Sequence, residues 1–515
     1  MPAPPMLPRA PRARPERGAA AAVLAHPGTA GALSPPRERA RRRLVWTVLT
    51  IYLLAIFEGA IRKYIAPQFG QYIFFIRDPF LLYAYVLATR FALWPGNRGF
   101  FALSLWMCVA GVLLFFMQAG VFGVDNIRLL LGVYGWRAYF FYVPLAFLMG
   151  VQFRRADLLL FARVTLLLAI PIAMLVLAQF ASPPNAPINV GVAEDQALQF
   201  KSVGITVERI RTTGTFTSPA GQQQFIASAF AFLLAMLLLP RKQSGVVFFA
   251  ITACGVLTCL ALSGSRGAML HCAIVGLAAV SVALVSKNAA LKAKAVFLPA
   301  SLVVAAVILY PIVFPDGFAT FMTRWNAAAG SEGGDTGILV RAALGMVDFV
   351  RFIGEVPVLG YGIGYGGNAS IILNAEVDGI KVGWLVEADL SRQMVDLGPI
   401  FGLGYIAFRM AFVAWLGITV IKATRRSADP LPVMLYAFAG VTVFAGQITG
   451  NGSINAYAWL FTGLCLAATR EACAPLGLRA ARTPVPVATS TARQPPPRAT
   501  RSRRRPSQRL AAPAR

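Results

Sequence analysis

Several cationic residues stand where the chain enters or leaves long apolar stretches. The guanidinium group of arginine offers a planar fork of donors that can bind a phosphate group through two hydrogen bonds. A charged side chain near membrane depth is costly, and it normally faces the protein interior, forms an ion pair or lines a substrate path. We therefore expect these cations to gather at one membrane surface around a phosphate or pyrophosphate. They are Arg62, Lys63, Arg77, Arg137, Arg209, Arg211, Arg266 and Arg341.

Two of these arginines have an equally plausible structural role. Arg62 follows Glu58 at the spacing of a helical ion pair. Arg77 is next to Asp78 and could be ion-paired through a third group. For these two residues the sequence leaves both interpretations open.

Arg266 lies within a run of small residues, Ser-Gly-Ser-Arg-Gly-Ala at 263–268, between two apolar stretches. Small residues let helices approach one another closely, so this turn would hold Arg266 rigidly at the surface. His271 follows about 7 Å deeper if the helix continues at its usual rise. A lone histidine on an apolar helix is usually a packing residue, and a catalytic role is the alternative.

Three carboxylates, Glu387, Asp389 and Asp396, precede a late apolar stretch. A carboxylate near apolar surface can have its pKa raised toward neutrality, as a general base requires. All three carboxylates are therefore candidates for acid/base work. The alternative is that the carboxylates form a solvated helix face.

Other motifs point away from nucleotides and metals. Residues 362–367 match G-x-G-x-x-G, but no βαβ unit can surround them, and we expect a flexible turn near the membrane. The sequence has no Walker motif and no H-E-x-x-H, and its six cysteines show no C-x-x-C spacing. We expect no metal and no cofactor.

The elements that position these residues are predicted to be membrane helices. The chain of 515 residues is 57% hydrophobic and only 13% charged, with a mean hydropathy of +0.64, which is far from the usual soluble balance. A spanning helix needs about 20 mainly apolar residues. Twelve such windows predict an all-α polytopic membrane protein: 44–62, 72–92, 99–119, 129–151, 157–180, 222–240, 246–263, 267–286, 296–314, 399–421, 431–448 and 456–470.

The positive charge is concentrated outside these windows. The net charge is +27, and much of it lies in Arg-rich tails at 1–43 and 471–515, for which we expect disorder. Contact with an anionic membrane surface explains these tails better than nucleic-acid binding does. Lys and Arg in short loops are retained in the cytoplasm, which predicts that both termini are cytoplasmic and that residues 44–470 form the transmembrane domain.

This orientation leaves two long segments outside, 182–221 and 315–398, and we expect the chemistry there. Loops of such length are usually functional or disordered. In the second segment, Val340–Phe352 shows helical spacing of apolar residues, so we predict a small helical cap on the outer face.

Three motifs in register resemble the O-antigen polymerase and ligase family. They are Arg-Thr-Thr-Gly-Thr-Phe-Thr-Ser-Pro at 211–219, the small-residue run at 263–268, and Pro-Val-Leu-Gly-Tyr-Gly-Ile-Gly at 357–364. Their order and spacing match, and the similarity covers about residues 205 to 405. Phe-Glu-Gly-Ala-Ile-Arg-Lys at 57–63 and Arg-Asp-Pro at 77–79 are similar to what a bacterial subgroup of the family carries.

The resemblance implies a metal-independent glycosyltransferase of the GT-C type. Its donor would be a glycan linked to undecaprenyl pyrophosphate at the periplasmic face of the bacterial inner membrane. By position, Arg211 and Arg266 would bind the pyrophosphate and Arg341 would support the site from the cap, while the cation pattern adds Arg209 and Arg62. Ligases of the family carry a His-Asn pair where this chain has Glu387 and Ala388.

We therefore expect a polymerase of lipid-linked oligosaccharide repeats with a glycan or lipid-linked acceptor, and the lipid bilayer is a further partner. Glu387 or Asp389 would activate the acceptor hydroxyl, and Arg266 would belong to the catalytic set. Without the histidine, ligation to a lipid A core or a protein is the second choice. A transporter or flippase of a lipid-linked or anionic solute is the rival from another class, since many spans and intramembrane arginines would suit it too. We expect no nucleic-acid partner.

Overall fold

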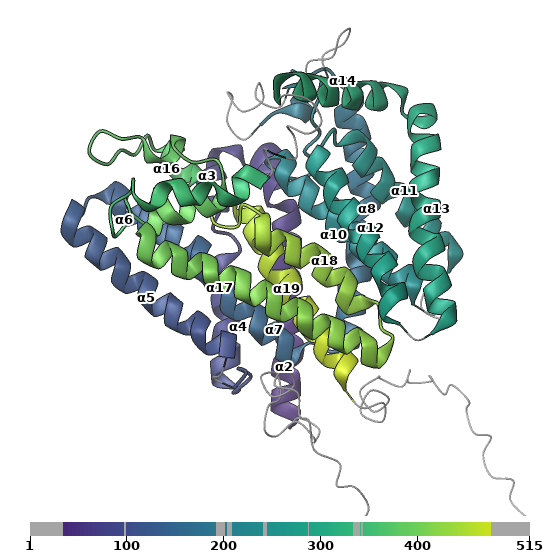
Figure 1. The fold of residues 1–515 in the computed structure, drawn as a ribbon, viewed down its shortest axis with the longest axis horizontal. Coiled ribbons are helices and arrows are strands. Elements are labelled where there is room, and N and C mark those ends of the chain that lie inside the picture. Colours follow the sequence, from purple (N-terminus) through teal and green to yellow (C-terminus); the bar gives the residue numbers. More distant parts are fainter. Residues whose placement is uncertain are drawn as a thin grey trace, which may run out of the picture.

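The computed structural model describes residues 34–96, 99–191, 201–202, 209–239, 245–286, 288–332, 340 and 343–474. In this part the chain is a bundle of α-helices, with one short antiparallel pair of strands, β1 (Lys201–Ser202) and β2 (Arg209–Ile210) (Figure 1). Arg341 and most of both Arg-rich tails lie outside the described residues.

Each predicted apolar window falls largely on helical residues. One helix starts earlier than expected, because α2 begins at Pro35, within the predicted tail of 1–43. The main helices are α2 (Pro35–Ala60), α4 (Asp78–Arg90), α5 (Gly99–Phe122), α6 (Asn126–Trp136), α7 (Val143–Gln152), α8 (Arg155–Ala181), α10 (Pro219–Leu238), α11 (Val246–Leu262), α12 (Arg266–Val285), α13 (Ala289–Val313), α14 (Pro315–Glu332), α17 (Asp389–Ser427), α18 (Leu431–Ala445) and α19 (Gly452–Cys473).

Seven helices in the described residues are long and apolar enough to cross a membrane: α2 with the turn after it, α5, α8, α10, α12, α13 and α17. Their composition indicates an all-α membrane protein. The other predicted spans lie on helices that are shorter or less apolar, such as α11 and α18. The number twelve therefore stays a prediction.

The bundle has a buried centre and a periphery that is apolar on its outside. In the most apolar 18 residues of α10 the share of buried residues is 89%, while in those of α13 it is 6% although their hydropathy is higher. A helix that is apolar all round lies either inside a protein or in lipid. Helix α10 is therefore central, and the exposed leucines and valines of α13 form a surface suited to lipid.

One end of the bundle, here called the basic end, is held by ion pairs among the helix connections. At the start of α2, Arg41 Nη1 lies 2.6 Å from Asp157 Oδ2, and Glu38 Oε2 lies 2.7 Å from Arg154 Nη2. At the end of α19, Arg470 donates to backbone carbonyls of residues 151 and 153. The described chain therefore begins and ends on the same face, as the predicted topology requires; which side is cytoplasmic stays a prediction.

The segment predicted as a cap carries α14, which lies across the ends of α11 and α13 in Figure 1. It also carries η6 (Asp348–Ile353), α16 (Asn368–Ile372), η7 (Val382–Trp384) and the start of α17. The described residues of this segment contain short helical turns, as expected. That they form a GT-C cap stays a prediction.

The glycine-rich run at 357–367 is not a flexible turn. Gly360 has φ +74°, and a Cβ there would stand 2.5 Å from the backbone nitrogen of Gly398. A Cβ on Gly364 would stand 2.3 Å from the carbonyl oxygen of Leu131. The glycines therefore allow backbone-to-backbone contact, and residues 362–367 are buried between α6 and the break in α17 at Gly398.

Candidate functional site

The loop that carries Arg211 is fixed by its backbone. The side-chain oxygen of Gln179, at the end of α8, accepts hydrogen bonds from the amides of Thr213 (3.2 Å) and Gly214 (2.8 Å). The hydroxyl of Thr212 donates to the carbonyl of Leu262, the last residue of α11, at 3.1 Å. These bonds place Arg211 beside the turn that begins at Ser263.

The turn that carries Arg266 is fixed just as firmly. Ser265 caps α12 by accepting from the amide of Ala268, and its hydroxyl donates to Gln223 Oε1 at 3.3 Å. A Cβ on Gly267 would stand 2.7 Å from the same Gln223 oxygen. The small residues therefore seat the start of α12 against the start of α10, as the sequence predicted for a rigid turn.

The structure brings Arg211 and Arg266 together. The pKa of Arg211 is lowered by burial and then by the positive charge of Arg266. Among the described residues neither arginine forms an ion pair, and Arg266 Nη1 is buried without a hydrogen-bond partner. Two like charges held together without an acid leave donors and positive potential that suit an anion.

Helix ends add to this potential. Helices α10 and α12 both start here, at Pro219 and Arg266. The first turn of a helix has unsatisfied amides and carries about half a positive charge. Ser218, at the N-cap of α10, makes no side-chain cap hydrogen bond. Both helix dipoles thus act in the same sense as the arginines.

The N-terminal motif packs against this site. A Cβ on Gly59 would stand 2.5 Å from the carbonyl of Thr215 and from the amide of Thr217, so the last turn of α2 touches the Arg211 loop directly. Beyond it, Lys63 Nζ donates to the hydroxyl of Thr213 at 2.6 Å. We call the region formed by the end of α2, the loop 211–217 and the turn 263–266 the site end; it is opposite the basic end.

The other cations near α2 are paired with acids. Glu58 lies 3.5 Å from Arg62 and 3.0 Å from the fully buried Arg77. Arg137 Nε lies 2.5 Å from Asp78 Oδ2. Arg62 and Arg77 therefore both form the ion pairs that a structural role requires. Arg62 is a weaker candidate for binding pyrophosphate than Arg211 and Arg266.

Asp389, predicted as a possible base, is buried in an ion-pair cluster. Its carboxylate lies 2.6 Å from Arg409 Nη1 and 3.3 Å from Arg392 Nη1. It also accepts from the amide (3.0 Å) and the hydroxyl (2.8 Å) of Thr449. Both oxygens are thus engaged, which favours a structural role. Asp389, Arg392, Arg409 and Thr449 are called the α17 cluster below.

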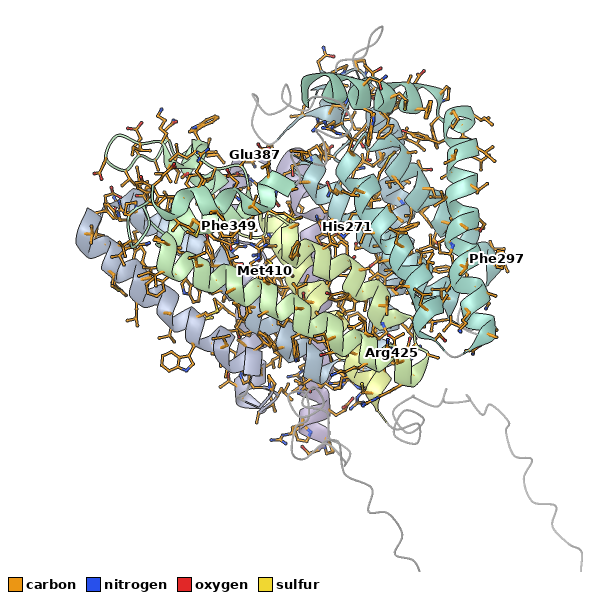
Figure 2. All side chains as sticks on the ribbon, viewed as in Figure 1. His271, Phe297, Phe349, Glu387, Met410 and Arg425 are labelled. Atoms are coloured by element: carbon orange, nitrogen blue, oxygen red, sulfur yellow. The ribbon has the colours of Figure 1, made fainter. Side chains whose placement is uncertain are left out.

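Glu387 differs from Asp389 in being exposed. Its carbonyl accepts from Gln447 Nε2 at 3.2 Å, which ties it to the α18–α19 loop. Figure 2 shows Glu387 and Arg425 at opposite ends of the bundle, so Glu387 lies away from the basic end. Of the two predicted bases, only Glu387 presents its side chain to the surface.

Asp396 and His271 both make structural contacts inside the bundle. Asp396 accepts from the amide of Gly366 at 2.6 Å and from the Tyr139 hydroxyl at 3.0 Å, which holds the glycine-rich run. The His271 ring stacks on Phe438 with centroids 5.0 Å apart, and its Nε2 contacts the Phe438 carbonyl at 3.3 Å. Arg209 lies in β2, and its side chain is outside the described residues, as is Arg341.

No sequence pattern indicated that Arg392, Arg409 and Thr449 would surround Asp389. Arg409 lies inside the predicted span 399–421, and Arg392 precedes that span by seven positions. In the described part of the chain, no group of three or more His, Cys, Asp or Glu side chains is placed to hold a metal ion.

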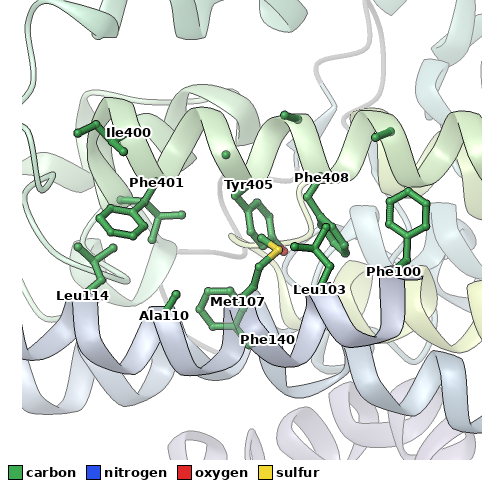
Figure 3. Close-up of a pocket in the computed structure, with 15 residues that line it drawn as sticks. Phe100, Leu103, Met107, Ala110, Leu114, Phe140, Ile400, Phe401, Tyr405 and Phe408 are labelled. Atoms are coloured by element: carbon green, nitrogen blue, oxygen red, sulfur yellow. The ribbon is translucent and has the colours of Figure 1, made fainter. Parts of the chain in front are cut away.

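An apolar groove lies between α5 and α17 (Figure 3). Its volume is ≈ 450 Å³, which is within the range of small-molecule sites. Phe100, Met107, Phe401, Tyr405 and Phe408 are among the side chains that line it. The cation site contains only a small cavity, so the two features differ in both size and chemistry.

Comparisons of this chain with protein-family models, with curated proteins and with solved structures found no match.

Proposed function

We propose that this protein is a membrane glycosyltransferase that polymerises lipid-linked oligosaccharide repeats at the periplasmic face of the inner membrane. The observation that carries the proposal is the pair Arg211 and Arg266, held together at one end of the bundle without an acidic partner among the described residues. Such a site suits the diphosphate of an undecaprenyl-linked donor.

The proposed reaction uses the chain's own side chains. The carboxylate of Glu387 takes the proton of an acceptor hydroxyl, whose oxygen attacks the anomeric carbon of the donor. The bond between that carbon and the phosphate oxygen breaks, and the lipid diphosphate leaves with the electron pair. Arg211 and Arg266 stabilise the negative charge that develops on this leaving group.

Rigid placement supports the catalytic part of the proposal. Preorganised donors need no rearrangement at the moment of reaction, and this makes them effective in sites with little water. The hydrogen bonds that the Gln179 side chain accepts from backbone amides provide that rigidity at Arg211, and the Ser265 cap provides it at Arg266. A protein acceptor or a lipid A core would turn the same chemistry into ligation.

The first experiment measures polymer formation by Arg266→Gln protein on a lipid-linked oligosaccharide in detergent. Removal of one preorganised donor typically costs about 10²–10³ in rate, so we expect the ladder of long products to disappear. Arg425→Gln, at an exposed position of the basic end, is the matched control and should retain the ladder. An unchanged ladder with Arg266→Gln at equal protein level would contradict the assignment.

A second experiment separates transferase from transporter. Single cysteines at 211, 266 and 387 are placed in a background without the six native cysteines and labelled from each side of a vesicle. One-sided labelling under all conditions agrees with a fixed site. Labelling from either side, depending on the solute gradient, would favour transport.

A further inference from the structure

The end of the N-terminal helix has an unusual backbone. Residues Ile61–Ile65, which follow α2 directly, form a π-helical turn. Such turns make up well under 1% of residues and are frequent at functional sites. Because the turn inserts an additional residue into the helical spacing, it changes the direction of the side chains that follow Gly59.

One of these side chains is Lys63. It is only 7% exposed, and its ammonium group donates to Thr213 at 2.6 Å. A lysine has three N–H donors. Within the described residues Lys63 forms no ion pair and no other hydrogen bond. Its ammonium group also lies 5.8 Å from the centroid of the Tyr64 ring. A buried ammonium group without an acid is costly, and one hydrogen bond and one distant ring leave it without a negative partner among the described residues.

Lys63 and Arg211 line the same cavity, together with Thr213, Thr217 and Asn189. Its volume is ≈ 10 Å³, about that of one water-sized probe. A whole phosphate does not fit into it, but a single phosphoryl oxygen does. The two cations come from segments far apart in the sequence and meet only at this point.

We propose that Lys63 is a third cation of the diphosphate site, and that it receives a phosphoryl oxygen between its ammonium group and Arg211. Lys63 is therefore a binding residue and not a structural one. This inference rests on the proposed function, which needs a diphosphate at Arg211 and Arg266. The same phosphoryl chemistry is offered by a lipid-linked diphosphate and by the headgroup of an anionic phospholipid.

The test uses the full-length protein in nanodiscs of phosphatidylcholine, with inorganic pyrophosphate as the probe and calorimetry as the readout. Hydrogen bonds to charged groups are worth about 1.5–3 kcal/mol, so Lys63→Gln should raise the Kd by about 10- to 100-fold. Lys63→Arg should restore part of the affinity. Lys422→Gln, an exposed lysine at the basic end, is the matched control and should leave the Kd unchanged.

Two further measurements distinguish a loss of binding from a loss of folding. Thr213→Val removes the hydrogen-bond partner of Lys63 and keeps the charge, so it should weaken binding less than Lys63→Gln does. The thermal midpoint of Lys63→Gln should equal or exceed that of the wild type, because a buried unpaired charge has been removed; a clear decrease would indicate a structural lysine and overturn the inference.

The outcomes separate this inference from the proposed function. If Arg266→Gln abolishes pyrophosphate binding while Lys63→Gln binds like the wild type, the inference is wrong and the diphosphate site stands. If the wild type does not bind pyrophosphate, both are wrong. Adding phosphatidylglycerol to the nanodisc identifies the source of the phosphoryl group. If the lipid competes with pyrophosphate in the wild type but not in Lys63→Gln, Lys63 binds a headgroup. If the lipid does not compete in the wild type, Lys63 binds the lipid-linked diphosphate.

Discussion

Two groups of buried or half-buried cations lie in this bundle, and they differ in what surrounds them. In the α17 cluster, Arg392 and Arg409 share the carboxylate of Asp389. At the site end, Lys63, Arg211 and Arg266 have no acid among the described residues. Each group contains a buried cation, Arg409 in the first and Lys63 in the second, so burial alone does not distinguish a structural cation from a ligand-binding one. The presence or absence of an acidic partner does.

This contrast has an energetic basis. Removal of one partner from a buried ion pair leaves an uncompensated charge and is strongly destabilising. Removal of an already unpaired cation leaves no such charge behind. Substitutions in the α17 cluster should therefore reduce stability, whereas substitutions of the three site-end cations should reduce binding.

The largest effect on stability is expected for Asp389→Asn. This change leaves Arg392 and Arg409 without a carboxylate, and the free energy of unfolding should fall by about 3–5 kcal/mol. Denaturant titration in detergent measures it. The control is Asp378→Asn, an exposed aspartate with φ +51°, a conformation that asparagine also tolerates. An equal, small effect of both changes would remove the distinction between the two groups of cations.

Arg211→Gln should show the opposite pattern. Because Arg211 has no acidic partner and is repelled by Arg266, stability should stay within about 0.5 kcal/mol of the wild type. Pyrophosphate affinity should fall by about 10- to 100-fold, as for the loss of a charged hydrogen bond. Calorimetry and denaturant titration on the same preparation check both. A large loss of stability with unchanged affinity would assign Arg211 to the structure.

Gly59→Ala tests whether α2 supports the site. The new methyl group would stand 2.5 Å from the Thr215 carbonyl, and such overpacking typically costs about 1–3 kcal/mol. Polymerising activity should fall as well, because the Arg211 loop is displaced. Gly120→Ala in α5, where a Cβ meets nothing within 4 Å, should be neutral or stabilising. Wild-type stability and activity of Gly59→Ala would contradict the packing argument.

The smallest effect is expected for Arg155→Gln at the basic end. Arg155 forms an ion pair with Asp429, and its side chain is 37% exposed. Exposed pairs contribute about 0.2–1 kcal/mol, and because the Asp429 side chain is only 7% exposed we expect a value at the upper end of this range. Activity on the lipid-linked donor should be unchanged, since the pair lies at the end opposite the site. Loss of activity at normal stability would show that the two ends are coupled.

The helices were largely predictable, because apolar composition is a local property. The window 267–286 differs by one residue at each end from α12 (Arg266–Val285). The start of α13 was missed, since the helix begins at Ala289, where Asn288 caps it by accepting from the amides of Ala290 and Leu291. This capping signal was present in the sequence, but a search for apolar residues passes over it.

The site was predictable only in part. The placement of Arg266 in a rigid turn followed from its small neighbours. Glu387 and Asp389 could not be told apart, because Asp389 is paired with Arg409 beyond the break in α17 at Gly398 and with Thr449, which is 60 positions away. The contact between Lys63 and Thr213 spans 150 positions. Side-chain pairs between distant segments leave no local pattern, so these required the structure.

The ion pairs and carbonyl contacts of the basic end bring the first and last described helices to the same strip of chain, residues 151–157. Tags fused to a chain trimmed to residues 34–474 would consequently be attached close to one another. Complementary fragments of a split fluorescent reporter, one at each end, could then reconstitute on a single molecule, and light from intact cells would give the sidedness of the whole bundle without extraction from its membrane.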